Sequence, residues 1–306
     1  MMADTMPSYI GRSVTRREDN RLVRGEGSFV GDIKLEGMLH VAIARSQQAH
    51  ASIEGVNLDE ARKVEGVVLA LSGTDLEDVL PPISGMQVAA PKTWSDGMDP
   101  QIEIPDQVLM PSDKLRYVGE PYALVVAENR YIAEDAAELI DNDFEPLSPV
   151  ANAEAASAEG ATLVHEHLPG NIAASLHAKT GDGVAALELA PRRLKRRYFH
   201  HRYASMPMEC RGVIAEFDSR TGSITVWSST QVVHWVRREV ANALDMPEER
   251  VRVIAPDVGG GFGGKGHVYP EDILVAYLAK KLGRPVKWLE DRHEHLLNAA
   301  HSRDIL

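Results

Sequence analysis

The stretch VRVIAPDVGGGFGGKGHVYPED (251–272) decides how we interpret this sequence. VRVIAP is a β-branched run typical of a buried strand, and EDILVAYLAKKLG (271–283) has the apolar spacing of a helix. Between them, five of the six residues 259–264 are glycine. Because glycine has no Cβ, the backbone N–H groups of such a loop approach a ligand closely and point at one anion. We therefore expect a phosphate, pyrophosphate or oxo group to bind here.

Two nucleotide-binding motifs also match this stretch in part. As a Walker A motif, GGGFGGK places Lys265 correctly, but Gly266 stands where a Ser or Thr hydroxyl normally binds magnesium. As a dinucleotide-binding fingerprint, G-x-G-x-x-G is matched from Gly259 to Gly264. That fingerprint needs a tight strand–turn–helix, whereas GHVYP intervenes before the helix here. A glycine loop without any ligand is the third alternative.

The composition of the 306 residues indicates a globular chain, with 44% hydrophobic and 25% charged residues. Its formal net charge of -12 argues against nucleic-acid binding, because that affinity depends on clustered cations. Cys210 is the single cysteine, so the chain forms no internal disulfide and holds no iron–sulfur cluster. No segment has the apolar core of a signal peptide or the ~20 apolar residues of a membrane span. We therefore expect a cytoplasmic protein.

Residues 1–150 mix short strands with helices, which predicts an α+β domain. Strands are expected within 64–73 and 115–128. A helix at 57–64 begins at Asn57, with Glu60 placed close to a capping-box arrangement. A second helix at 131–140 has an apolar stripe formed by Ile132, Ala136, Leu139 and Ile140.

Two stretches have little regular pattern. Residues 78–114 carry many prolines, which interrupt helices and sheet ladders, so we expect an extended surface loop. Residues 149–184 are rich in Ala, Glu and Gly and low in large apolar residues, which favours a linker.

The second half of the sequence is more regular. Its apolar patterns predict two helices, 231–244 and 271–283, with Gly283 at the C-terminal cap of the second. Strands are expected, in chain order, at 194–201, 212–218, 251–256 and 284–291, with a turn followed by a strand within 220–230.

Several segments closely resemble the molybdenum-binding subunits of the xanthine dehydrogenase and aldehyde oxidase family, including aerobic carbon monoxide dehydrogenase. The glycine-rich stretch is the most specific of them. The others occur along the chain in the family's order: IGRSVTRREDNRLVRGEGSFVGDI (10–33), RSQQAHASI (45–53), LRYVGEPYALVVAENRYIAEDAAELI (115–140), HHRYASMPMECRGVIAEFD (200–218), VWSSTQ (226–231) and VKWLEDRHEHLL (286–297).

The resemblance implies a domain organisation. Residues 1–150 are similar to the family's hammerhead domain. Residues 186–306 are similar to the first part of its molybdenum cofactor-binding α+β domain, with 151–185 as the linker between them.

The resemblance also implies roles for individual residues. Gln231, in SSTQ, matches the glutamine whose amide hydrogen-bonds an oxygen ligand of molybdenum, and Phe262 matches the phenylalanine beside the metal. The loop amides that match the family's pterin cradle are those of Gly260, Gly261, Phe262, Gly263 and Gly264. Because the pterin dithiolene holds the metal, the protein supplies surrounding donors and no metal ligand. Taken without its context, Gln231 is an ordinary residue at a helix start.

The family's chemistry implies a molybdenum-dependent oxidoreductase that hydroxylates a small N-heterocycle or aldehyde with oxygen from water. The cofactor is molybdenum–molybdopterin, in bacterial members usually in its cytosine dinucleotide form. Electrons then leave through partner subunits that carry iron–sulfur clusters and FAD.

Two departures from the family pattern qualify this expectation. Gly266 follows Lys265 where purine-oxidising members carry a substrate-binding glutamate, which argues against purine hydroxylation. The family's C-terminal Gly-Val-Gly-Glu stretch, whose glutamate is the general base, has no match in these residues. We therefore expect a second chain to carry the C-terminal portion and to complete the molybdenum site. The alternative is that these residues are a truncated part of a longer subunit.

Other polar clusters are expected to be structural. The pairs His165/His167 and His293/His295 lack further zinc-like ligands and indicate surface residues, while His200 and His201 point to opposite faces of a strand. Cys210 is expected to act as a small apolar filler. The charge run 192–197 is expected at a solvated strand edge, or else at an interface.

Two other classes of function stay open from the residues alone. One is a nucleotide-binding dehydrogenase domain that uses the glycine-rich loop. The other is a non-catalytic assembly subunit. Bound pterin rather than NAD excludes the first, and activity that depends on Gln231 excludes the second.

Overall fold

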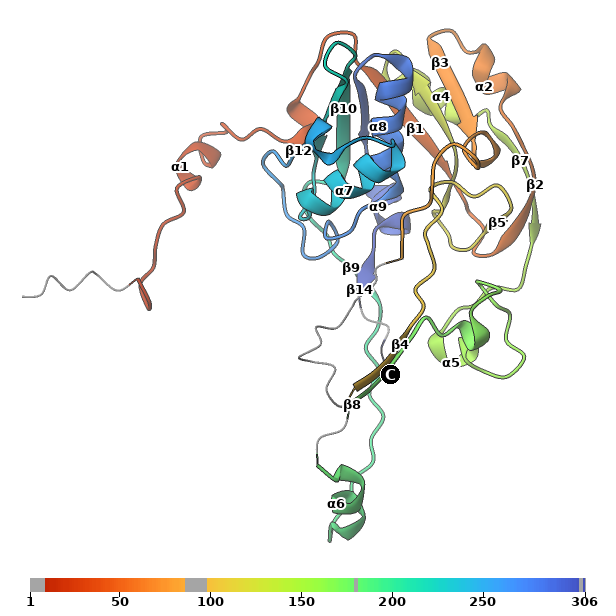
Figure 1. The fold of residues 1–306 in the computed structure, drawn as a ribbon, viewed down its shortest axis with the longest axis vertical. Coiled ribbons are helices and arrows are strands. Elements are labelled where there is room, and N and C mark those ends of the chain that lie inside the picture. The colour runs from red at the N-terminus through yellow and green to blue at the C-terminus, as the bar shows by residue number, and fades with distance from the viewer. Residues whose placement is uncertain (1–8, 86–97, 179–180, 303–304, 306) are drawn as a thin grey trace, which may run out of the picture.

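A seven-stranded mixed sheet runs through the computed structural model, which describes residues 9–85, 98–178, 181–302 and 305 (Figure 1). Neighbours β12–β11 and β13–β1 are parallel, and the other neighbouring pairs are antiparallel. In sheet order the strands are β12 (Val251–Ile254), β11 (Ser223–Ser228), β10 (Gly212–Asp218), β13 (Val286–Leu289), β1 (Leu39–Arg45), β6 (Pro121–Ala127) and β3 (Val67–Ser72).

This sheet contains strands from both halves of the sequence. Leu39 of β1 is the register partner of Val286 in β13, and the Leu39 N–H donates to the carbonyl of Pro285 at 2.8 Å. The pattern within each half does not predict this pairing, because periodicity reports which face of a strand is buried and not its neighbour. The expected α+β class is confirmed.

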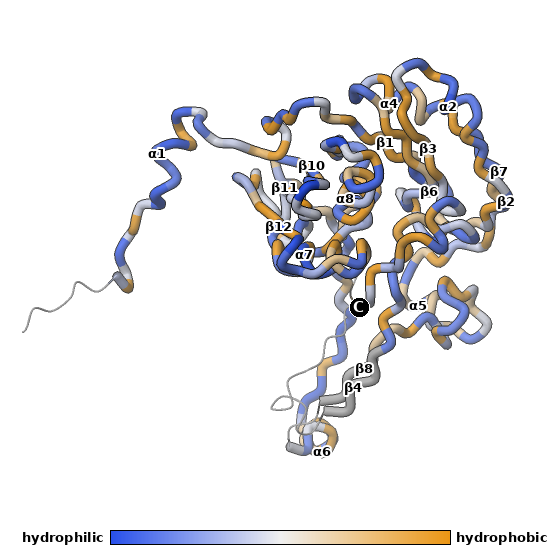
Figure 2. Tube along the Cα trace, turned by 45° about the horizontal axis from the view of Figure 1, so that its top comes forward, coloured by the Kyte–Doolittle hydropathy of each residue, from blue (hydrophilic) through white to orange (hydrophobic). Residues whose placement is uncertain are grey.

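Helices cover both faces of the sheet. Helices α7 (Val233–Ala243) and α8 (Pro270–Leu282) share the main core with Leu39 and Val41 of β1. The alternate residues of β1, Ala42 and Ala44, face α4 (Arg130–Ala137) and α2 (Asp59–Lys63). Figure 2 shows apolar residues along α8 and along strands β1, β3 and β6.

Smaller elements surround this body. A three-stranded sheet is formed by β5 (Lys114–Leu115), β2 (Ala51–Asn57) and β7 (Asp141–Pro146). In Figure 1, α1 (Asp19–Leu22) projects to one side, and β4 (Met98–Ile102), β8 (Ala174–Ala178) and α6 (Gly183–Leu189) extend below the body. The remaining short pieces are α5 (Ala153–Ala156), β9 (Tyr203–Ala204), α9 (Arg292–Asn298) and β14 (His301–Ser302).

Most expected elements of the second half are confirmed: the strands within 212–218, 251–256 and 284–291, the turn and strand within 220–230, and the helices within 231–244 and 271–283. Gly283 ends α8 in the left-handed conformation, with φ of 62°. The strand expected at 194–201 is wrong, because residues 194–199 are exposed and have no regular structure. Within the described residues, His200 is the one position of this stretch in a β-bridge, an isolated antiparallel bridge with Ile305.

The first half also needs corrections, one of which is strand β4 within the expected loop 78–114. The capping box expected at Asn57 is wrong in part. Oδ1 of Asn57 accepts the Asp59 N–H at 2.9 Å, but Leu58 is the N-cap residue and Glu60 pairs with Lys63. Leu139 is 48% exposed and Ala133 takes its place on the buried stripe of α4. The loop 78–114 is not all on the surface, since Leu109 and Met110 lie in the main core. Residues 86–97 of that loop lie outside the described residues.

A buried ionic network joins the two halves. The Arg45 guanidinium binds Glu271 at 2.7 Å and Glu294 at 2.8 Å. Arg211 binds the second oxygen of Glu271 at 3.2 Å and Glu290 at 2.6 Å. All of these side chains are buried or nearly so, and removing one partner of a buried pair typically costs about 3–5 kcal/mol. The network therefore fixes β1 against α8, α9 and β10.

One buried carboxylate makes the stability of this fold depend on pH. Glu120 is 5% exposed, and burial raises its pKa to about 7, although the Arg116 N–H hydrogen-bonds the carboxylate. Its folded-state pKa thus exceeds the unfolded value. The protonated Glu120 side chain therefore contributes fully to the free energy of unfolding below about pH 4.5. This contribution is lost as the pH rises through about 7.

We therefore predict that Glu120→Gln stabilises the protein at pH 8 by about 1–3 kcal/mol and has little effect at pH 5. Glutamine keeps the acceptor oxygen and never ionises. Denaturant unfolding at both pH values measures the difference, with the exposed Glu77→Gln as control. If Glu120→Gln changed the free energy of unfolding equally at both pH values, ionisation of Glu120 would not explain the effect.

Candidate cofactor-binding site

The glycine-rich loop (258–266) leaves β12 and reaches α8 through a series of turns. Gly260 and Gly263 have φ of 96° and 89°, a region that residues with a Cβ rarely adopt. Phe262 also lies at positive φ, 51°, and its side chain is 76% exposed. A non-glycine residue held in this conformation is strained, a feature that clusters at ligand-binding sites.

Neighbouring side chains lie directly against the loop backbone. A Cβ on Gly261 would stand 2.4 Å from Oε1 of Gln231, and one on Gly264 would stand 2.2 Å from Oγ of Ser205. On Gly259 it would meet Cβ of Glu209 at 2.4 Å. Close packing therefore requires glycine at 259, whereas a Cβ at 261 or 264 would force the side chain of Gln231 or Ser205 to move.

Gln231 and the loop lie together, as the sequence predicts. The side-chain Oε1 of Gln231 accepts the Gly263 N–H at 3.2 Å, and the backbone N–H of Gln231 donates to the Lys265 carbonyl at 2.9 Å. Helix α7 begins later, after Val232, whose N–H donates to Oγ1 of Thr230 at 3.1 Å. Gln231 thus contacts the loop and does not cap the helix.

The loop amides divide into two groups. The Gly263 N–H donates to Gln231, and the Gly264 N–H donates to the Gly261 carbonyl at 2.9 Å. Within the described part of the chain, the consecutive N–H groups of Gly260, Gly261 and Phe262 donate to no acceptor. Three adjacent main-chain donors suit the phosphate or oxo oxygens of an anionic ligand.

Glu209 anchors both ends of the loop, a role that the sequence analysis missed. Its Oε2 accepts from the Gly259 N–H at 2.8 Å, from Oγ of Ser229 at 2.7 Å and from Nζ of Lys265 at 2.9 Å. The Lys265 side chain is fully buried, and burial lowers its pKa while Glu209 opposes that shift. Residues 206–210 (MPMEC) form no helix or strand, so no periodic sequence pattern predicts the role of Glu209.

His295 contradicts the expectation of a surface histidine pair. It is fully buried, with Nδ1 2.8 Å from Oε2 of Glu290 and Nε2 2.8 Å from the Ser205 carbonyl. The carbonyl and the carboxylate both accept, so both ring nitrogens donate. His293 is exposed as expected. His295 therefore connects the ionic network to Ser205, the residue packed against Gly264.

Burial by itself would raise the pKa of Glu290, but hydrogen bonds from His295 and Arg211 hold it at about 2. Cys210, which is half-buried rather than a buried filler, lies with Glu290 and His295 in a group whose ligand atoms are within 4.8 Å. Both ring nitrogens of His295 already have partners. This group is therefore part of the ionic network.

The N-terminal segment binds the base of the loop. Arg21 donates to both carboxylate oxygens of Asp257 at 2.5 Å, and the Ser28 N–H donates to Asp257 at 2.8 Å. The hydrogen bond from Arg21 is the main reason that the pKa of Asp257 falls to about 2. Asp257 is therefore ionised at neutral pH and holds residues 21–28 beside the loop entrance.

Two family models match the chain. The model of the aldehyde oxidase and xanthine dehydrogenase a/b hammerhead domain matches residues 24–148, and that of a molybdopterin cofactor-binding domain matches residues 164–306. The chain belongs to the aldehyde oxidase and xanthine dehydrogenase family of molybdenum-binding subunits. The resemblance on which the sequence analysis rests is thereby confirmed.

Individual relatives agree with this family. The nicotine 6-hydroxylase large subunit of Paenarthrobacter nicotinovorans is 37% identical over 97% of this chain and 35% of its own length. The carbon monoxide dehydrogenase large chain of Hydrogenophaga pseudoflava is 31% identical over 94% of this chain and 36% of its own. Quinoline 2-oxidoreductase from Pseudomonas putida 86 superposes with a TM-score of 0.84 at 36% identity, over 96% of this chain and 36% of its own. The chain thus spans about a third of the length of these relatives.

Among the described residues, no helix has the length and apolar character to span a membrane.

We predict that Glu209→Ala loosens the glycine-rich loop while the central sheet persists. The substitution leaves the buried Lys265 cation unpaired, which costs about 3–5 kcal/mol, and it frees the Gly259 amide. Hydrogen–deuterium exchange should become faster in residues 259–265, whereas the exposed Glu216→Ala on β10 should leave it unchanged. Unchanged exchange in Glu209→Ala would show that Glu209 does not anchor the loop.

Proposed function

We propose that this chain forms one wall of the molybdenum-cofactor site of a molybdenum hydroxylase. The observation that carries the proposal is the glycine-rich loop, whose three consecutive free N–H groups lie beside Gln231. The reaction is hydroxylation of a small N-heterocycle or aldehyde with oxygen from water. Relatives named for nicotine and quinoline favour the N-heterocycle.

The residues present fit an anionic pterin cofactor. Gly260, Gly261 and Phe262 offer main-chain donors, and the missing Cβ atoms at 260 and 261 let Pro207 and Gln231 pack closely against the loop. Phe262, exposed and held at positive φ, provides an apolar surface beside those donors. When bound, the molybdenum group accepts the electrons of the oxidation and supplies the water-derived oxygen.

Gln231 would donate to that group through its side-chain amide. Because its Oε1 accepts the Gly263 N–H, its Nε2 keeps two N–H donors, and no acceptor takes them within the described residues. A neutral donor held by the loop stabilises negative charge that develops on a nearby oxygen without adding charge of its own. The residue therefore acts by positioning and electrostatics.

The dinucleotide-binding alternative has less support. Strand β12 ends at Ile254 and α8 begins at Pro270, so the glycines are not at a tight strand–helix turn. The first turn of α8 carries the acidic residues Glu271 and Asp272, both buried. Their carboxylates oppose a pyrophosphate at this helix N-terminus.

The rest of the site comes from polypeptide that aligns with the remaining length of the relatives and supplies the general base. Leu189, Leu194 and Tyr198 are 84%, 77% and 73% exposed, and such apolar side chains indicate a contact with further polypeptide. The charge run 192–197 accompanies them and is exposed as expected, although it lies in no strand. We further propose the cytosine dinucleotide form of the cofactor, iron–sulfur and FAD partner subunits, and a cytoplasmic location.

We predict that Gly261→Val and Gly263→Val each abolish cofactor retention in the purified complex. Valine at 261 collides with Gln231, and at 263 it resists a φ of 89°. Metal analysis and pterin fluorescence measure retention. Gly55→Val in β2, where a Cβ meets nothing within 4 Å, is the control. Normal cofactor content in both loop variants would exclude the loop as the cradle.

We also predict that Gln231→Ala in the assembled complex lowers kcat roughly 100- to 1,000-fold with nearly full molybdenum content. Many loop amides hold the cofactor, whereas the lost donor acts on the reaction. Gln231→Glu keeps an oxygen for Gly263 but lacks the N–H donors, so it should be equally slow. Steady-state kinetics and molybdenum content are measured on the same preparation. Wild-type kcat in Gln231→Glu would show that Gln231 only supports the loop.

A further inference from the structure

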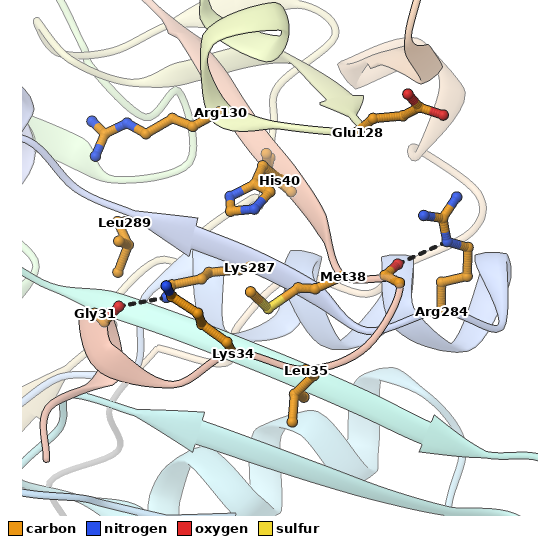
Figure 3. Close-up of a pocket in the computed structure, with 12 residues that line it drawn as sticks. Gly31, Lys34, Leu35, Met38, His40, Glu128, Arg130, Arg284, Lys287 and Leu289 are labelled. Atoms are coloured by element: carbon orange, nitrogen blue, oxygen red, sulfur yellow. Dashed lines mark hydrogen bonds between the residues drawn. The ribbon is translucent and has the colours of Figure 1, made fainter.

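A second cavity, separate from the glycine-rich loop, lies on the central sheet (Figure 3). Its volume is about 590 Å³, within the range of small-molecule sites. His40 of β1 and Lys287 of β13 are register partners on its floor, and Lys34, Arg130 and Arg284 line its walls. Five basic side chains from separate segments thus line one cavity of a chain whose net charge is -12, although the Arg130 guanidinium extends away from His40 (Figure 3).

Lys287 is the most constrained of these cations. It is 4% exposed and donates to the carbonyls of Gly31 at 2.8 Å and Ile33 at 2.9 Å. Burial lowers its pKa, nearby Asp32 opposes this shift, and Lys34 adds to it. A buried ammonium with neutral partners is costly unless an anion comes close.

The other cations add to this positive charge. Arg284 donates through Nε to the Gly37 carbonyl at 2.9 Å, a neutral partner. Lys34, which is exposed, has no hydrogen bond or ion pair within the described residues. Arg130 is paired with Glu134, and Glu128 is the one acidic residue among those that line the cavity.

The geometry points to a binding site for a compact organic polyanion, whose charge is carried by phosphate or by clustered carboxylates. Lys34, Arg284 and the remaining N–H of Lys287 supply charge-assisted donors around the space. Leu35, Met38 and Leu289 provide an apolar wall for the uncharged part of the ligand. The site shares no residue with the glycine-rich loop, so it is independent of the proposed function.

Isothermal titration calorimetry of the 306-residue chain at low salt tests this site. The probes are pyrophosphate, inorganic phosphate and citrate. We expect saturable binding at one site, weakened by added salt, with Lys34→Ala and Arg284→Ala each lowering the affinity about tenfold or more. Lys63→Ala, which removes an exposed cation paired with Glu60, should bind like the parent.

The probes separate the two sources of charge. Tighter binding of pyrophosphate indicates a phosphate ligand, and tighter binding of citrate, lost in the same variants, indicates a polycarboxylate. Circular dichroism of each variant confirms that the fold is kept. The proposal is overturned if none of the three probes binds saturably. It is equally overturned if folded Lys34→Ala and Arg284→Ala bind as well as the parent.

Discussion

The Arg211 guanidinium, held between Glu271 and Glu290 in the interior, is the interaction on which the rest of the structure depends. It lies 3.8 Å from the centre of the Tyr269 ring, which adds a cation–π contact. Burying this charge is favourable only because every partner is in place. Since the partners come from α8 and the end of β13, Arg211 fixes both relative to β10.

The same network reaches the candidate site by two routes. Glu290 binds His295, whose other nitrogen holds the Ser205 carbonyl, and Ser205 packs on Gly264. Tyr269, beneath Arg211, donates its hydroxyl to the Gly264 carbonyl at 2.5 Å. The loop that carries the free amides is thus rigidly supported, which preorganises donors for a ligand.

Glycine content and apolar periodicity are local properties, so they predicted the loop and most elements of the second half. Gln231 was singled out only by the family resemblance, and its role stays a prediction. The sequence did not predict Arg45, Glu209 or His295 as parts of the support, since their partners are distant in the chain and depend on which strands become neighbours. The prediction of a strand at 194–201 failed for the same reason, because pairing depends on which segments become neighbours in the fold. The side chains of this stretch favour a strand, but a strand forms only where a neighbour accepts its hydrogen bonds.

The central claim is that residues 258–266 hold the cofactor through their main-chain amides. Hydrogen–deuterium exchange of the assembled complex, produced with and without pterin synthesis, tests it most directly. The account predicts that exchange of Gly260, Gly261 and Phe262 slows markedly when the cofactor is present, with little change in the basic cavity around Lys287. Equal exchange of the loop in both preparations would contradict it.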